Sequence, residues 1–194
     1  MMELISDKQQ EDGRVWHILT SHPRLDTRVS FTIRASVSLM QNDELALSFI
    51  LKGDLSDVHL PIESNPQRRD GLWRDTCFEV FVAGGGTQYY EFNFSPSRCW
   101  AAYAFSDYRE RLIVQDPVVF PIINLKKSKN RIVLTTKLPF IALPLLGQEK
   151  KMRIGLSSVI KTDDGNLTYW ALCHPAGTPD FHCHRGFLVN LAAS

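Results

Sequence analysis

The sequence predicts an all-β fold, an antiparallel β-sandwich with little helix, from three observations. Apolar and polar residues alternate through residues 28–39 and again through residues 44–52, with a short polar turn between them. Shorter segments rich in β-branched and aromatic residues recur through the rest of the chain, separated by glycine, proline and aspartate. No long segment has a helical period. Many short strands without helices are typical of a sandwich or a barrel rather than of a parallel sheet.

The first two strands form the clearest predicted hairpin. Every second residue of the first run is apolar, namely Val29, Phe31, Ile33, Ala35, Val37 and Leu39. The second run repeats this pattern with Leu45, Leu47, Phe49 and Leu51. Further strands are expected, in chain order, at residues 57–61, 76–83, 88–95, 100–105, 131–138, 152–160, 167–174 and 187–191.

Length and composition restrict the remaining possibilities. A chain of 194 residues is expected to form one domain, residues 1–194, with the polar residues 1–13 as a loosely ordered arm. A net charge of +1 argues against a nucleic-acid partner. No apolar run approaches a membrane span and the first residues lack the apolar core of a secretory signal, so we expect a cytoplasmic protein without a membrane partner.

The four cysteines lie far apart in the sequence, at Cys77, Cys99, Cys173 and Cys183. They have no CxxC pair and no zinc-finger spacing. In a reducing compartment such residues are expected to be free thiols, mostly buried as small apolar side chains.

The segment with most information on function is a hairpin around Gly84–Gly86. Pairing about Gly85 would place Phe78 opposite Phe92 and Val80 opposite Tyr90 on the core face. A shift of one residue would set apolar faces against polar ones, so the two faces are well defined.

The opposite face of this hairpin carries the predicted ligand surface. The same register places Glu79 opposite Glu91 and Cys77 opposite Asn93, and Trp73 and Asp75 are expected to extend this face. Opposed carboxylates repel, so we expect a cationic partner, which could be an arginine, a metal or a polar ligand.

Several arginines could neutralise these carboxylates, and we include Arg68 and Arg69 in the surface. For the ion pair itself we expect Arg69 or Arg153 within reach of one glutamate. An ordinary solvated sheet face crossed by Arg–Glu pairs is the alternative interpretation. A large aromatic beside acids and an amide favours a polyhydroxylated ligand, which offers apolar ring faces and many hydroxyls.

The C-terminal segment 169–187 adds three histidines. In an extended backbone His182 and His184 point to one side, and with His174 they could hold a metal. Without a completing carboxylate the pattern is weak, so we expect no metal, and His174 and His182 are instead expected to form hydrogen bonds in a loop or with a ligand.

Residues 71–109, together with the motifs GLSSVI (155–160) and YWALCHPAGTPDFHCHRGF (169–187), resemble the DOMON-like β-sandwich proteins of bacteria. Their superfamily includes the family 9 carbohydrate-binding modules and the haem domain of cellobiose dehydrogenase. The resemblance covers most of the chain from about Ser30 onward, and it implies a sandwich with a ligand surface for sugar or haem. It assigns to that surface Trp73, Asp75, Glu79, Glu91, Asn93, His174 and His182.

These observations predict a non-catalytic module that binds a small polar, carbohydrate-like ligand. One alternative is an enzyme that uses Glu79 and Glu91 for acid–base chemistry, with or without a metal. A haem-binding domain is another alternative. For the binding module itself we expect neither haem nor a metal as a resident cofactor. A protein-interaction module is the last.

Overall fold

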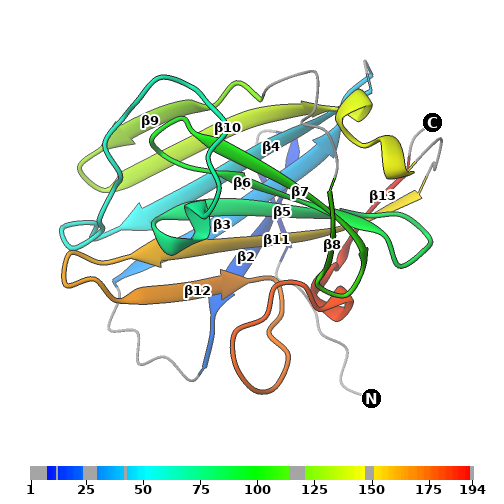
Figure 1. Cartoon of the computed structure of the whole chain (residues 1–194). Helices are drawn as coiled ribbons and strands as arrows, with labels where there is room; N and C mark the ends of the chain where they lie inside the picture. Colours follow the sequence, from blue (N-terminus) through cyan, green and yellow to red (C-terminus); the bar gives the residue numbers. More distant parts are fainter. Residues whose placement is uncertain are drawn as a thin grey trace.

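The computed structural model describes residues 8–11, 13–23, 30–41, 43–113, 121–146 and 151–192. Their strands form two antiparallel sheets (Figure 1). The first sheet contains β1 (Lys8–Glu11), β2 (Arg14–Ser21), β3 (Phe31–Leu39), β4 (Glu44–Gly53), β9 (Asn124–Ser128) and β10 (Arg131–Pro139). The second contains β5 (Cys77–Ala83), β6 (Tyr89–Phe94), β7 (Trp100–Asp107), β8 (Glu110–Leu112), β11 (Lys151–Lys161), β12 (Leu167–Ala171) and β13 (Val189–Ala192).

The order of the strands places β5, β6 and β11 in the middle of the second sheet. That sheet runs β8-β7-β6-β5-β11-β12, and β13 pairs with the first residues of β11. The first sheet runs β2-β3-β4-β10-β9, with β1 beside β2. The two sheets are joined at one corner, where Trp170 and Ala171 of β12 pair with Ser21 and Thr20 of β2.

The main core lies between the sheets and follows the predicted alternation. Ile33 and Phe49 come from the first sheet, and Phe78 and Phe92 from the second, and all four are buried. The rings of Phe49 and Phe78 lie 5.2 Å apart across the two layers. Burial of side chains of this size contributes about 1.5–3 kcal/mol each, so this face fixes the parity of every central strand.

A second apolar layer covers the outer face of the second sheet. Phe81, Tyr89 and Phe105 project from this face, and Phe187, from the segment between β12 and β13, packs with them. All residues of β5 and β6 are therefore buried, on both sides of the sheet. In Figure 1 the segment between β12 and β13 (orange to red) forms long loops beside this sheet.

Most predicted strands are confirmed, and the differences have local causes. Residues 57–61 form only an isolated bridge between Val58 and Thr162. The structure adds four strands that were not predicted: β1, β2, β8 and β9. β1 lies inside the segment expected to be a loose arm and pairs with β2. Residues 1–7 and 12 of that arm lie outside the described residues, as do residues 28–29 of the first predicted strand. β2 lacked the signal because Trp16 and His17, which face opposite sides, are both buried.

Helical structure in the described residues is limited to single 3₁₀ turns. They are η1 (Leu72–Arg74), η2 (Phe140–Ala142), η3 (Pro144–Leu146) and η4 (His184–Gly186). Nowhere in the described part of the chain is there a helix with the length and apolar character needed to cross a membrane.

The predicted register of the β5–β6 hairpin is wrong by two residues. Phe78 pairs with Phe94, and Glu79 pairs with Asn93 rather than with Glu91. The strands stop at Ala83 and Tyr89, so the pairing is centred on Gly86 instead of Gly85. A shift of two residues preserves the faces, and the two glutamates therefore still share the outer face, as diagonal neighbours.

Candidate functional site

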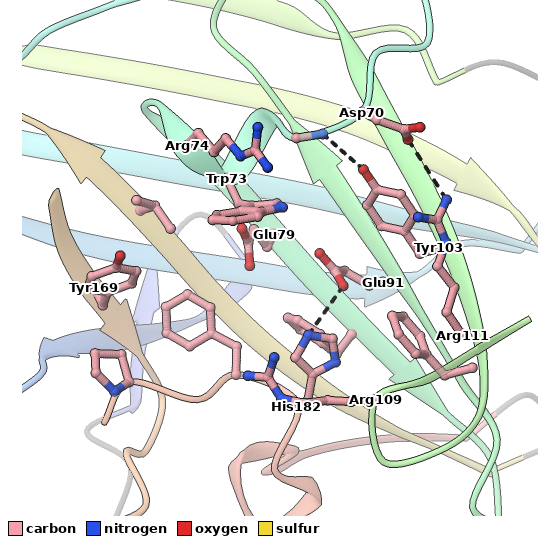
Figure 2. Close-up of a pocket in the computed structure, with 16 residues that line it drawn as sticks. Asp70, Trp73, Arg74, Glu79, Glu91, Tyr103, Arg109, Arg111, Tyr169 and His182 are labelled. Atoms are coloured by element: carbon pink, nitrogen blue, oxygen red, sulfur yellow. Dashed lines mark hydrogen bonds and ion pairs between the residues drawn. The ribbon is translucent and has the colours of Figure 1, made fainter. Parts of the chain in front are cut away.

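A pocket of about 690 Å³ opens on the outer face of the second sheet. Strand residues form its floor and part of its walls, and loop residues form the rest of the walls (Figure 2). It is lined by Asp70, Gly71, Trp73, Arg74, Glu79, Phe81, Glu91, Tyr103, Phe105, Arg109, Arg111, Val159, Tyr169, Pro179, Phe181 and His182.

Glu79 and Glu91 bring two carboxyl groups to the floor of this pocket. Only 2% of Glu79 and 6% of Glu91 is exposed. In the sheet, Glu79 lies between Asn93 and Ser157. Glu79 Oε2 accepts a hydrogen bond of 3.3 Å from the Ser157 hydroxyl, but Oε1 has no hydrogen-bond partner among the described residues. A buried carboxyl oxygen without a partner lacks the hydrogen bond that water would give it.

The second carboxyl is held more completely. Glu91 Oε1 accepts a hydrogen bond of 2.7 Å from the side-chain amide of Asn93. Its Oε2 lies 3.6 Å from His182 Nε2, the contact drawn at the centre of Figure 2. The amide of Asn93 thus fixes one oxygen of Glu91 and leaves the other turned toward the histidine.

Burial raises the pKa of both carboxyl groups. The pKa of Glu91 rises from 4.5 to about 7, chiefly through loss of hydration, against the opposing effects of Asn93, Arg109 and Arg111. The pKa of Glu79 is raised well above its ordinary value by burial and then by the charge of Glu91. Burial therefore favours the protonated form of Glu79, which can donate a hydrogen bond, and near neutral pH Glu91 is close to its midpoint.

His182 is a neutral imidazole held by an aromatic cluster. Its Nδ1 lies 2.8 Å from the Tyr89 hydroxyl, whose oxygen accepts a hydrogen bond from the backbone N–H of Arg109. These contacts place the imidazole of His182 between the Tyr89 hydroxyl and the carboxyl group of Glu91. Burial, followed by the charge of Arg109, lowers the pKa of His182 to about 4, so its contact with Glu91 is not an ion pair at neutral pH.

Trp73 is the main apolar surface that the pocket leaves accessible. It lies in the single turn η1 and 45% of it is exposed, whereas Trp170 is only 6% exposed. Gly71 begins the turn with a left-handed φ of 75°, and its N–H donates to the Tyr103 hydroxyl at 3.2 Å. This hydrogen bond ties the turn that carries Trp73 to β7.

Four of the nine residues predicted for the ligand surface line the pocket. They are Trp73, Glu79, Glu91 and His182. Two others support lining residues from outside. Asn93 holds Glu91, and Arg68 forms an ion pair of 3.1 Å with Asp70.

The structure does not bring the other three into the pocket. Arg69 is exposed outside it. Asp75 lies 3.7 Å from His59 and 4.0 Å from Lys161. His174 bonds to the carbonyl oxygen of Thr20 at 2.8 Å, at the corner where the two sheets meet.

The predicted arginine partners of the glutamates are wrong. The described contacts pair neither Arg69 nor Arg153 with Glu79 or Glu91, and Arg153 instead contacts His184 Nδ1 at 3.5 Å. The cations that act on Glu91 are Arg109 and Arg111. Arg153 pairs with Ala83, four residues along β11 from the Ser157 that lies beside Glu79, and Arg69 lies outside the pocket.

The three histidines proposed as weak metal ligands are separated in the fold. His174 bonds to Thr20, His182 to Tyr89, and His184 contacts Arg153. Within the described residues no group of three or more His, Cys, Asp or Glu side chains could hold a metal ion. All four cysteines are free; Cys77 and Cys99 are buried, and Cys173 and Cys183 are partly exposed.

Sequence reasoning missed most of the pocket walls. Tyr103 and Phe105 were placed in a strand but not assigned to a face, although they share the parity that β7 presents to Glu91. Arg109 lies in the short turn between β7 and β8 with a φ of 57°, and Arg111 in a strand of three residues. Neither gives a periodic signal. Phe181 lay in the aromatic segment that was singled out, without a position relative to the sheet.

Two solved structures share this architecture. One is a candidate carbohydrate-binding protein from Bacteroides uniformis, with a TM-score of 0.65 and 16% identity, matched over 93% of this chain and 86% of that chain. The other is a family 9 carbohydrate-binding module from Caldicellulosiruptor kristjanssonii in complex with cellotriose, with a TM-score of 0.51 and 7% identity, matched over 89% of this chain and 81% of that chain. The chain has the fold of these modules.

The sandwich expected from the sequence resemblance is therefore confirmed at the level of the fold. These two structures do not test the haem part of the resemblance. No protein-family model matches the chain, and a search of curated proteins finds no match.

Proposed function

We propose that this protein is a non-catalytic binding module that takes a small carbohydrate-like ligand in the pocket between Trp73 and Glu79. One observation carries this proposal: an accessible tryptophan ring stands over a buried carboxyl group whose Oε1 has no partner among the described residues. A sugar offers an apolar ring face for the first group and hydroxyls for the second.

The chemistry of the floor suits hydroxyl groups in particular. A hydroxyl both donates and accepts hydrogen bonds, so it can accept from a protonated Glu79 and donate to Glu91. The pocket is preformed, because β5 and β6 are buried on both faces and Asn93 fixes Glu91. Likeness of fold to a module bound to cellotriose supports the same class of ligand.

The test is isothermal titration calorimetry and thermal shift with mono- and disaccharides on the wild type, Trp73→Ala and Glu79→Gln. Loss of a stacking contact costs on the order of 1–3 kcal/mol, so Trp73→Ala should weaken binding by about tenfold to a hundredfold. Its melting temperature should change little, because the ring is only partly buried. Ile62→Ala, at an exposed position outside the pocket, is the matched control.

Failure of every saccharide to bind the wild-type protein would refute the proposal. Equal affinity of wild type and Trp73→Ala for a bound sugar would place the site elsewhere on the molecule.

One observation favours a second function, an enzyme with a carboxyl acid–base pair. Glu91, with a pKa raised to about 7, lies in a pocket beside a second carboxyl, and groups tuned in this way serve as general acids or bases. Incubation of bound saccharides with the protein, followed by chromatography of the products, separates the two functions. An enzyme converts the sugar, and conversion should disappear in Glu91→Gln.

A further inference from the structure

The rim of the pocket carries an excess of positive charge. Three arginines line it, Arg74, Arg109 and Arg111, against one acidic side chain outside the floor, Asp70. Figure 2 shows these arginines on different sides of the opening. What they can offer a ligand depends on the partners they already have.

Arg109 is largely occupied by the protein. One of its Nη atoms lies 2.8 Å from Asp180 Oδ1, and its Nε lies 3.3 Å from the Tyr108 hydroxyl. Tyr108 also donates to Asp180 Oδ2 at 2.9 Å. This set of bonds positions the β7–β8 turn, and the carboxylate of Asp180 offsets the charge of Arg109.

Arg74 is in the opposite situation. Its guanidinium lies 5.1 Å from the centre of the Trp73 ring. No acidic side chain of the described residues lies within ion-pair distance of it. A cation beside an exposed aromatic ring, without a carboxylate of its own, places positive charge next to the surface on which a sugar ring would stack.

Arg111 shares the single rim carboxylate. Its guanidinium lies 4.3 Å from the centre of the Tyr103 ring and 4.0 Å from Asp70. The same Asp70 oxygen is held more closely by Arg68, at 3.1 Å. Asp70 is therefore already paired, and Arg111 retains most of its charge toward the pocket.

The floor does not offset this charge in full. Burial raises the pKa of Glu79 well above its ordinary value and that of Glu91 to about 7. A ligand with an anionic group would meet two carboxyl groups whose burial favours the protonated form, and two arginines with spare charge. A concave site lined by one sign of charge concentrates ligands of the other sign.

We propose that the ligand of this pocket is an acidic saccharide, one that bears a carboxylate or a phosphate, and that Arg74 and Arg111 supply the selectivity for its anionic group. The proposal rests on the proposed function, since it names the class of sugar that the same site takes. It makes the arginines the source of the preference for charge, and Trp73 and Glu79 the contacts to the sugar itself.

The experiment compares a neutral sugar with two sugars that carry an anionic group at C6. Calorimetric titration of the wild type with glucose, glucuronate and glucose 6-phosphate should give an affinity at least about tenfold higher for one of the anionic sugars. The carboxylate and phosphate arms show which anion the rim prefers. The higher affinity for the anionic sugar should decrease when the salt concentration is raised to about 0.15 M, because salt screens charges on exposed side chains such as Arg111.

Substitutions then test the two arginines. The double variant Arg74→Gln, Arg111→Gln should bind glucuronate and glucose equally, and the corresponding double lysine variant should keep part of the preference because it keeps the charge. Arg98→Gln is the matched control, since Arg98 pairs with Glu63 outside the pocket. The salt dependence of the wild type tests the same point without a substitution.

The outcomes separate the two proposals. Binding of glucose as tight as binding of both anionic sugars would overturn the acidic ligand and leave carbohydrate binding intact. A preference for the anion that survives in the double glutamine variant would overturn the assignment to Arg74 and Arg111. Absence of binding to any sugar would refute both proposals together.

Discussion

Replacement of Glu91 by glutamine tests the electrostatics of the pocket floor without any ligand. Glutamine has nearly the same shape, and its carbonyl can still accept the bond from Asn93 that now reaches Glu91 Oε1 at 2.7 Å. What it removes is a carboxyl group that burial forces to hold its proton up to a pH of about 7.

The size and sign of the effect follow from the pKa of Glu91. A rise from 4.5 to about 7 corresponds to about 3 kcal/mol, at about 1.4 kcal/mol per pKa unit. Because the folded-state pKa lies above the ordinary value, folded Glu91 keeps a proton that the unfolded chain has released. Its contribution to stability is complete below pH 4.5 and is lost as the pH rises through 7.

The free energy of unfolding of Glu91→Gln should therefore be close to that of the wild type at pH 4.5. At pH 8 it should exceed that of the wild type by up to about 3 kcal/mol. The charge of Glu91 also raises the pKa of Glu79, so the variant relieves both carboxyls. The pKa of His182 is lowered from 6.5 to about 4, so its contribution to stability is lost as the pH falls from 6.5 through 4. This loss affects both proteins alike.

The measurement is urea unfolding at several pH values between 4 and 8. Glu63→Gln removes a glutamate from the exposed surface and is the control. A difference between Glu91→Gln and the wild type that stays constant across this range would show that Glu91 is not held in its protonated form. The account of the pocket floor would then be wrong.

Three further substitutions test local features of the fold. Gly53→Ala should lower the free energy of unfolding by about 3 kcal/mol or more, because its Cβ would clash with the carbonyl oxygen of Ser30 at a φ of 143°. Gly165→Ala has a φ of 89° and open space around it, so it should lower the free energy of unfolding by about 1 kcal/mol. Similar losses in both variants, measured by urea unfolding, would contradict this reading. Tyr89→Phe removes the bond to His182 Nδ1 and should cost about 1–3 kcal/mol; an unchanged melting temperature would mean that this bond does not hold the histidine.

The sequence predicted most strands of the two sheets because their signal is periodic. Alternation in β3 and β4 places Ile33 and Phe49 in the core, and the structure confirms this. The β5–β6 hairpin shows the limit of the method. Parity follows from Phe78 and Phe92, whose burial leaves no choice of face, but three successive glycines do not define which of them is the centre of the turn.

The candidate site could be predicted only where strands carry it. Glu79 and Glu91 were found because period two places them on the face opposite to the core. Arg109 and Arg111 were missed because their positions depend on a tight turn and a strand of three residues. His174 was misleading, since an aromatic, histidine-rich segment does not reveal which of its side chains turns toward the sheet.

The carboxyl of Glu79 connects the fold to the proposed function. Its Oε1 is buried without a partner in the described structure, and an apolar side chain of the same size would avoid that loss. The pocket above Glu79 is where a ligand can supply a hydrogen bond to this carboxyl. A hydroxyl there would bond to Glu79 while its ring covers Trp73. The carboxyl that burial makes costly to ionise is then the group that the ligand contacts.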